Sequence, residues 1–236
     1  MLSDKYKSTP VYGYIPKEKI RFCDKDLFGD DLWKYVILKK IKLWYGTPKS
    51  GDDNLKYKII LGIQCVYQDT VSGIKTTTDQ HCGDISADDI EIKEHELKEN
   101  DYYTKFYIDM ENAITHLKFV TKTGEILELG KEKDHTKRTV EFNDDKEPNM
   151  IHSFVGIYNS FGLRALGCKF ILKKDFFLIN LIGILRLRHL FKTNEKEKKK
   201  WENIEELNKL SFEMKAIAKL CLLPDATFTV VMRYCA

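Results

Sequence analysis

The segment 150–171 constrains the fold of this chain more than any other part of its 236 residues. It reads MIHSFVGIYNSFGLRALGCKFI, and apolar side chains alternate with other residues on both sides of a short loop. Alternation with a period of two is typical of β-strands, because successive side chains point to opposite faces. Gly156, Gly162 and Gly167 punctuate the pattern. The segment is therefore predicted to be a strand, a tight glycine-bearing loop and a second strand.

Strand patterns also fill most of the preceding chain, and a helical period is not evident before residue 172. The clearest candidates are the segments 35–45, 57–67, 90–97, 102–109, 114–121 and 125–130. Residues 122–124, ending in glycine, are predicted to form the turn of a hairpin. About ten to twelve short strands, spaced by roughly 8–12 residues, are typical of an all-β sandwich, barrel or prism.

The composition limits the class of partner. Hydrophobic residues make up 43% of the chain and charged residues 32%, as in a globular protein. The 39 Lys and Arg nearly balance the 36 Asp and Glu, for a net charge of +3. Nucleic-acid binding favours a concentrated basic face, so no nucleic-acid partner is expected.

The cysteines and the first ten residues indicate the cellular compartment of the protein. None of the six cysteines forms a C-x-x-C pair, and Cys65 and Cys168 lie at apolar positions inside predicted strands, where a thiol acts as a small hydrophobe. The first ten residues lack the apolar core of a signal peptide. We expect reduced thiols in an intracellular, non-secreted protein of the cytoplasm or of a cytoskeleton-associated assembly, without a transmembrane helix.

The last part of the chain has a different sequence pattern. Residues 176–185 are uncharged, but this run is about half of the roughly twenty residues that span a bilayer. Residues 201–221 carry apolar side chains at helical spacing and are predicted to form an amphipathic helix, and 227–235 a short strand. These segments are expected to pack on the β body or to dock in a partner, with membrane-surface contact as the third alternative. The residues expected to dock are Phe176, Phe177, Leu181, Ile184, Trp201, Leu207 and Met214.

Five short segments of the chain, in order, carry a family resemblance. They are FGDD at 28–31, the strand blocks IKLW at 41–44 and GIQCVY at 62–67, the segment ITHLKFVTKTG at 114–124, and GIYNSFGLRALG at 156–167. Together they resemble the jacalin-type lectin domain over residues 28–173. The resemblance implies an all-β body, a β-prism of three antiparallel four-stranded Greek-key sheets. The chain then divides into an N-terminal arm (1–27), the β-prism domain (28–173) and a C-terminal α-helical extension (174–236).

The resemblance also points to a ligand site, in which a Gly-x-x-x-Asp loop holds a sugar through the aspartate carboxylate. Here Arg164 replaces that aspartate, the loop is two residues shorter, and the family's N-terminal Gly-Gly is missing. Arginine only donates hydrogen bonds, so it cannot perform the carboxylate's role. Arg164 is interpreted either as a contact for an anionic partner or as a surface arginine paired with a nearby acid. The candidate ligand residues are Asn159, Ser160, Phe161, Gly162, Leu163, Arg164, Asp30 and Asp31.

The alternatives for those residues are structural. Asn159 and Ser160 are turn-capping types, and Asp30 and Asp31 have no further ligand spacing for calcium. His81 and Cys82 suggest a metal, but no second cluster accompanies them. We therefore expect no cofactor and no metal.

Motifs for a catalytic serine, a phosphate-binding loop or a zinc protease are missing from the sequence. The sequence thus favours a non-enzymatic structural or adaptor subunit of a multiprotein assembly. A true carbohydrate-binding lectin, with its ligand at residues 159–164, is the competing hypothesis. A hydrolase or transferase on a β scaffold is the third hypothesis, and it has no supporting motif.

Overall fold

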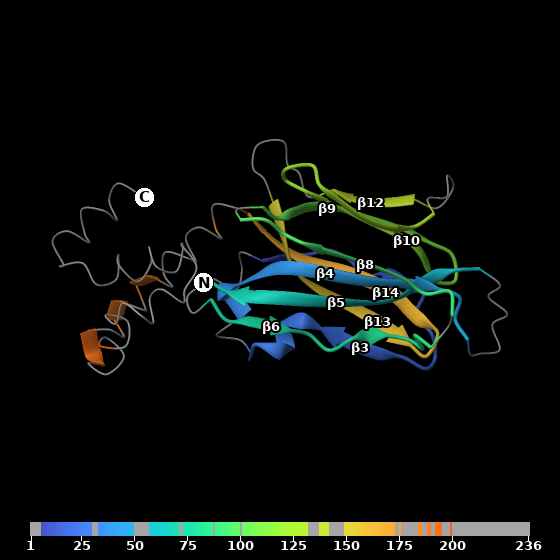
Figure 1. Ribbon diagram of the computed structural model, residues 1–236, viewed down its shortest axis with the longest axis horizontal. Coiled ribbons are helices and arrows are strands. Elements are labelled where there is room, and N and C mark those ends of the chain that lie inside the picture. The colour runs from blue at the N-terminus through green and yellow to red at the C-terminus, as the bar shows by residue number, and fades with distance from the viewer. Residues whose placement is uncertain are drawn as a thin grey trace.

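The computed structural model of the chain is built from strands in three antiparallel sheets (Figure 1). It describes residues 6–29, 33–49, 57–70, 73–86, 88–99, 101–131, 137–141 and 149–172, with further positions at 175, 184–185, 188–189, 192–194 and 199. The strands are β1 (Lys7–Ser8), β2 (Tyr12–Gly13), β3 (Ile20–Cys23), β4 (Val36–Gly46), β5 (Ile59–Asp69), β6 (Lys75–Thr77), β7 (His81–Cys82), β8 (Glu91–Glu96), β9 (Tyr103–Met110), β10 (Ile114–Thr121), β11 (Ile126–Gly130), β12 (Lys137–Glu141), β13 (Asn149–Asn159) and β14 (Gly162–Leu172). The 3-10 helices η2 (Asp24–Leu27) and η3 (Trp33–Tyr35) lie between β3 and β4.

Each sheet has four strand positions. The β4–β5 sheet has the order β6-β5-β4-β8, the β9–β10 sheet β11-β10-β9-β12, and the β13–β14 sheet β1-β14-β13-β3. β6 and β7 pair with successive parts of β5, and β1 and β2 with successive parts of β14, so each of these pairs is one interrupted edge strand. The predicted prism of three antiparallel four-stranded sheets is confirmed.

Two sheets have the Greek-key order, in which the fourth strand returns to lie beside the first. β12 returns to β9 in one sheet, and β8 returns to β4 in the other. The β13–β14 sheet differs, because it combines strands from the beginning and the end of the described body. Its interrupted edge strand and β3 come from the segment 7–23, for which the sequence predicted no strand.

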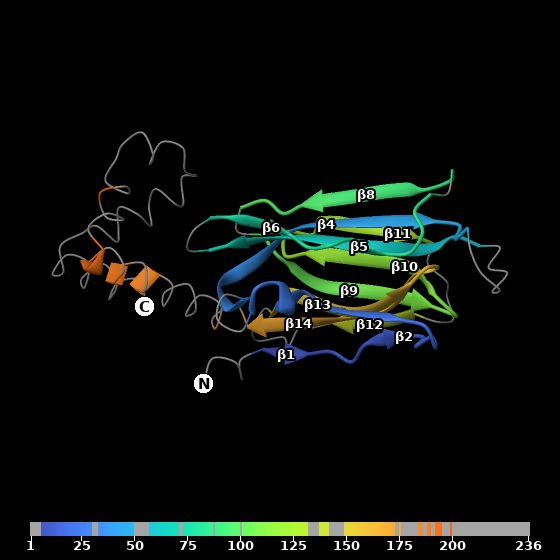
Figure 2. The same ribbon diagram turned by 90° about the horizontal axis from the view of Figure 1, so that it is seen from below.

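The core lies between the sheets and is built by the alternation seen in the sequence. Ile41 of β4, Phe119 of β10 and Phe154 of β13 have no exposed surface, so all three sheets contribute to it. The ring of Phe119 contacts that of Phe154 with centroids 5.6 Å apart, joining two sheets. Burying each such side chain contributes roughly 1.5–3 kcal/mol. Figure 2 shows the strands of all three sheets running along the length of the body.

The local predictions in the β body are confirmed. The segments expected to be strands coincide with β4, β5, β8 to β11, β13 and β14 to within a few residues. The turn at 122–124 also forms: Gly124 has φ 89° and its amide donates to the Thr121 carbonyl at 3.1 Å. Glycine suits this turn because other residues rarely adopt a positive φ.

The C-terminal extension falls mostly outside the described residues. Those that are described, such as Asp175, Ile184 and Lys199, have helical backbone, except for Asn194. Of the predicted docking residues only Ile184 is described, and the other six lie outside. In the part of the chain that the structure describes, no helix has the length and apolar character needed to span a membrane.

Candidate functional site

The turn between β13 and β14 is where the sequence predicted a ligand loop. Asn159 pairs with Gly162, which leaves Ser160 and Phe161 as the turn residues. The Asn159 side-chain Oδ1 accepts a hydrogen bond from the Phe161 amide at 3.1 Å. The turn-capping role considered for Asn159 is therefore confirmed. The turn is short because β13 and β14 form a hairpin whose pairing continues to Asn159 and Gly162.

A segment from another sheet closes over this turn. Asp84, which follows β7, donates its backbone N–H to the Ser160 carbonyl at 2.8 Å. Gly83 lies so close that a Cβ on it would be 2.4 Å from the Gly162 nitrogen. Only glycine allows this approach, so Gly83 is needed to seal the turn against the β4–β5 sheet. Neither Gly83 nor Asp84 was predicted to belong to the site.

Arg164 lies in β14, and only 1% of its surface is exposed. The expectation that it is a surface arginine on the loop is wrong. Its guanidinium carbon lies 5.3 Å from the ring centroid of Tyr14 and 6.0 Å from that of Phe161, at cation–π distance. The Tyr14 amide also donates to the Arg164 carbonyl at 3.1 Å. Burial follows from the pairing of β2 with β14, which brings Tyr14 over the arginine.

The remaining loop candidates divide by accessibility. Leu163 is fully buried, and Gly162 is buried with φ 148°. Ser160 is exposed, while Asn159 and Phe161 are partly exposed. Ser160, Asn159 and Phe161 are therefore the members of the loop that can reach a ligand from this surface. Asp30 and Asp31 lie outside the described residues.

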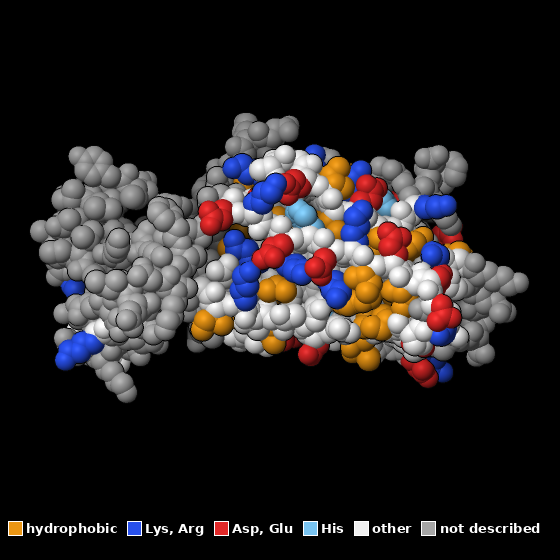
Figure 3. All heavy atoms as spheres, viewed as in Figure 1, with side chains coloured by type: hydrophobic (Ala, Val, Ile, Leu, Met, Phe, Trp, Pro, Cys, Tyr) orange, Lys and Arg blue, Asp and Glu red, His pale blue; other side chains and the backbone are white. Residues whose placement is uncertain are grey.

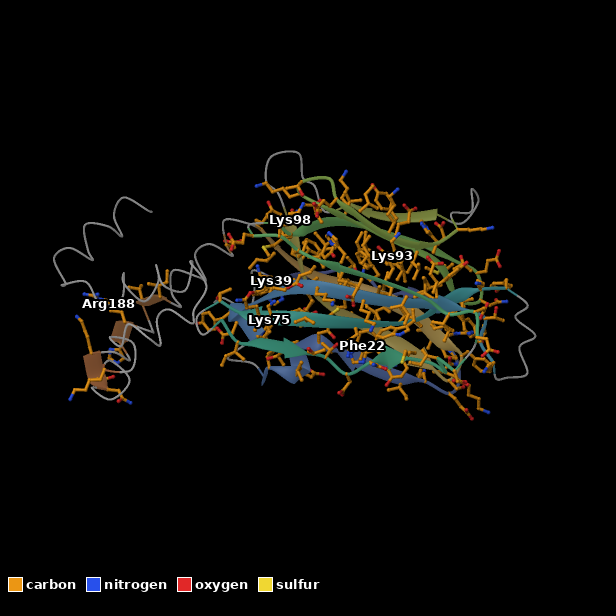
Figure 4. The ribbon with its side chains drawn as sticks, viewed as in Figure 1. Phe22, Lys39, Lys75, Lys93, Lys98 and Arg188 are labelled. Carbon is orange, nitrogen blue, oxygen red and sulfur yellow. The ribbon has the colours of Figure 1, made fainter. Side chains whose placement is uncertain are left out.

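Beside the turn, three rings from two sheets form an aromatic cluster of Phe22, His81 and Tyr158. Phe22 and His81 stack with centroids 3.9 Å apart, and Tyr158 lies 6.3 Å from Phe22 and 5.9 Å from His81. Ile20, on the same edge strand as Phe22, is 54% exposed. Figure 3 shows apolar side chains gathered at the lower right of the body, and Figure 4 marks Phe22 on that face. Aromatic side chains at the surface are enriched at recognition sites.

A buried carboxylate supports the aromatic cluster from below. Asp24 is 3% exposed, accepts hydrogen bonds from the Tyr67 hydroxyl and the Phe154 amide, and lies 3.4 Å from His81 Nε2. Burial raises the pKa of Tyr67 well above its usual value, and the negative charge of Asp24 raises it further. Tyr67 therefore stays protonated and acts as a donor. Asp24 joins three segments of the body, a structural role that the sequence did not reveal.

A second buried polar cluster lies in the β9–β10 sheet. His116 is 1% exposed, and its Nδ1 lies 3.2 Å from Asp109 while its Nε2 lies 2.9 Å from Glu128. The sequence showed these residues only as scattered charges. Within the described ranges, no group of three or more His, Cys, Asp or Glu side chains is arranged to hold a metal ion.

The described cysteines are free thiols. Cys65 and Cys168 are buried in strands, which confirms their prediction as small hydrophobes. Burial raises the pKa of the Cys65, Cys82 and Cys168 thiols above its usual value. The thiolate is the nucleophilic form, so these side chains are poorly suited to nucleophilic catalysis at neutral pH.

Comparison with known proteins agrees with this architecture. Residues 53–169 match the family described as the jacalin-like lectin domain. A mannose-binding jacalin-related lectin from Ananas comosus has a similar structure, with TM-score 0.51 and 15% identity over 71% of this chain and 99% of that chain. Frutapin, a lectin from Artocarpus incisa, has TM-score 0.51 and 15% identity over 71% and 98% of the two chains.

Artocarpin, solved in complex with methyl-α-mannose, is also similar, with TM-score 0.51 and 15% identity over 71% of this chain and 99% of that chain. At this level of identity the likeness is one of fold. No curated protein sequence matches the chain.

Proposed function

Because this chain contains a jacalin-like lectin domain, we propose that it is a non-enzymatic binding subunit that docks protein partners within a larger assembly. The observation that carries this proposal is the state of the apex, the β13–β14 turn. There the protein's own groups occupy the place where sugar-binding members of the family are expected to hold a hydroxyl. Arg164 stands at the aspartate position and is covered by Tyr14 and Phe161.

The hydrogen-bonding groups of the turn support the same proposal. The Phe161 amide is taken by Asn159, and the Ser160 carbonyl is taken by Asp84. A sugar hydroxyl needs such donors and acceptors to be open, since leaving a polar group unpaired on binding costs affinity. An apex whose hydrogen-bonding groups are paired within the protein is better suited to a scaffold than to a monosaccharide site.

Two surfaces are candidates for partner contact. One is the aromatic cluster of Phe22, His81 and Tyr158 with the exposed Ile20 beside it. The other is the apolar sequence of the C-terminal extension, which contains Phe176, Phe177, Leu181, Ile184, Trp201, Leu207 and Met214. Leaving so many large apolar side chains in water is costly, so we propose that a partner covers part of them.

Carbohydrate binding is the second candidate, and the family match favours it. In this mode a glycan would contact the exposed side of the 159–164 turn, together with Asp30 and Asp31. The exposed Ser160 and the partly exposed Phe161 offer a hydroxyl and an aromatic ring, which are common elements of sugar recognition.

A capture experiment separates the two candidates. The tagged full-length chain is used to retain partners from its native extract, with and without a mixture of competing free sugars. Protein partners retained in the presence of sugars support the docking proposal. Elution of those partners by sugar would replace it with the carbohydrate proposal, and a Ser160→Ala, Phe161→Ala double variant would then be expected to lose retention.

A further inference from the structure

β8 is an open edge of the β4–β5 sheet. It has six residues, and each of the other described edge strands is shorter. Among the described strands it pairs with β4 alone. Its side chains are exposed, apart from the partly buried His95. Figure 2 shows β8 along the upper margin of the body, and Lys93 marks its position in Figure 4. The edge is therefore accessible to another chain.

The free edge carries the backbone groups of alternate residues. The Leu97 amide donates to the Lys39 carbonyl oxygen at 2.7 Å, which continues the ladder between β4 and β8. Alternate residues of an antiparallel strand direct both of their backbone groups to the same neighbour. The odd-numbered residues of β8 therefore bond to β4, and the N–H and C=O groups of Ile92, Glu94 and Glu96 point away from it. These groups are a template for one added strand.

The charges along this edge select the kind of strand that fits. Residues 88–99 contain six carboxylates and two lysines, for a net charge of −4, although the whole chain carries +3. On the outer face, Lys40 lies 2.9 Å from Glu94 and Lys75 lies 2.8 Å from Glu96. Both ion pairs are exposed, and each carboxylate has a second oxygen for a further donor. Ile92, which is 54% exposed, adds an apolar contact on the same face.

A second copy of β8 fits this edge poorly. An antiparallel copy that uses the free backbone groups must place even-numbered residues opposite even-numbered residues. The symmetric registers that overlap most of β8 then place Glu94 opposite Glu94, or Lys93 opposite Lys93. Like charges directly opposite each other destabilise a sheet. The edge is thus guarded against self-association and stays open to a strand of different sequence.

We propose that β8 accepts an extended segment of a partner protein as an added antiparallel strand, with Lys or Arg at the alternate positions that face Glu94 and Glu96 and an apolar residue facing Ile92. In this mode of recognition the backbone bonds provide affinity and the alternate side chains provide specificity. The inference rests on the docking function proposed above and names the chemistry of the partner. Its surface is separate from the aromatic cluster and from the C-terminal extension.

The test is amide hydrogen exchange of the full chain, followed by nuclear magnetic resonance, with the acetylated and amidated peptide KTKEVT. Antiparallel to β8, this peptide places its lysines opposite Glu96 and Glu94 and its valine opposite Ile92. At about four times the dissociation constant, exchange of these three amides should slow about fivefold, because only the free protein exchanges. The Lys93 amide, which faces β4, should change little. The charge-reversed peptide ETEKVT should give no protection.

Variants of the edge separate the backbone from the charges. Glu94→Pro removes the N–H at the centre of the free edge and leaves the bonds to β4 intact, so protection by KTKEVT should be lost. Glu94→Ala is the matched control, because it keeps the N–H and should retain protection. The double variant Glu94→Lys, Glu96→Lys keeps every backbone donor and should prefer ETEKVT, which tests the charges even if the proline variant does not fold.

Equal protection by both peptides, or by neither, would overturn the proposal, as would a folded Glu94→Pro variant that is still protected. Protection that rises with protein concentration in the absence of peptide would assign the edge to a second copy and overturn it as well. Capture of protein partners without protection by peptide would leave the docking function in place and remove this inference. Protection without capture would do the reverse.

Discussion

The ring of Phe22 stacks on the imidazole of His81, with centroids 3.9 Å apart and planes inclined by 10°. Phe22 belongs to β3 of the β13–β14 sheet, and His81 belongs to β7 of the β4–β5 sheet. The stack therefore joins the edges of two sheets where no backbone ladder connects them. The Phe22 ring also lies close to Gly156, whose lack of a side chain makes room for it.

Gly156→Ala should destabilise the protein by about 1–3 kcal/mol, because a Cβ there would be 2.5 Å from the Phe22 ring and 2.7 Å from the Ala165 carbonyl oxygen. Urea unfolding followed by tryptophan fluorescence measures the loss. In a Phe22→Ala background the same change should cost less, since part of the clash is gone. Strictly additive losses in the double variant would show that Phe22 does not determine the need for glycine.

Asp24→Ala should reduce the free energy of unfolding by roughly 3 kcal/mol, because it leaves the Tyr67 hydroxyl and the Phe154 amide as buried donors without their acceptor. Asp26→Ala is the matched control, since Asp26 lies in the same 3-10 helix and is exposed. It should change stability by less than about 0.5 kcal/mol. Equal effects of the two substitutions would assign Asp24 no special role.

The protein should become less stable as the pH is lowered, because of His152. This residue is completely buried against Tyr6 and Trp33, and burial lowers its pKa to about 3. In the unfolded chain the His152 side chain titrates at about pH 6.5, so below that pH the unfolded state binds the proton more readily than the folded state. This contribution to stability is complete above about pH 6.5 and is lost at about 1.4 kcal/mol per pH unit as the pH falls toward 3. Urea unfolding at several pH values measures the slope.

The control for this dependence of stability on pH is the His152→Gln variant. Other groups also titrate between pH 6.5 and 3, but they are shared by both proteins. The variant should show a shallower loss between about pH 6 and 5, whatever its absolute stability. Identical slopes would mean that His152 becomes protonated without unfolding.

Removal of residues 174–236 should leave a folded β body. The three clusters of buried core residues all lie between Tyr35 and Ile171, with their peripheral contacts beginning at Tyr6. Circular dichroism of the truncated chain should show a β-sheet spectrum, and capture of protein partners should be lost. Partner capture equal to that of the full chain would transfer the docking role to the β body itself.

Strand positions could be predicted because side-chain alternation is local and survives in the fold. Cys65 and Cys168 belong to alternating runs, and both are buried as that pattern requires. The turn at 122–124 was equally local. The number and order of the sheets could not be derived from periodicity, which suits a sandwich as well as a prism. They came from the family resemblance.

The site was harder to predict because its contacts are not local. Arg164 looked like a loop residue, and its burial depends on Tyr14, which is far away in sequence. Gly83 and Asp84 gave no signal, because a glycine before an acid is common in turns. Asp24 lies in a charged stretch, and nothing in that stretch indicates that the Tyr67 hydroxyl will meet it. Such residues can be found only when the pairing of distant segments is known.

The pairing of Thr9 with Cys168 has a consequence for how the protein is made. The Thr9 amide donates to the Cys168 carbonyl at 2.9 Å, and the Cys168 amide donates to the Thr9 hydroxyl at 3.0 Å across 159 positions of sequence. On a ribosome, β1 and β2 have no edge to join until β14 has emerged. We expect the other two sheets to form earlier and this one to close last, as a slow step of high contact order. Until then, the newly made amino-terminal segment is open to chaperones and proteases.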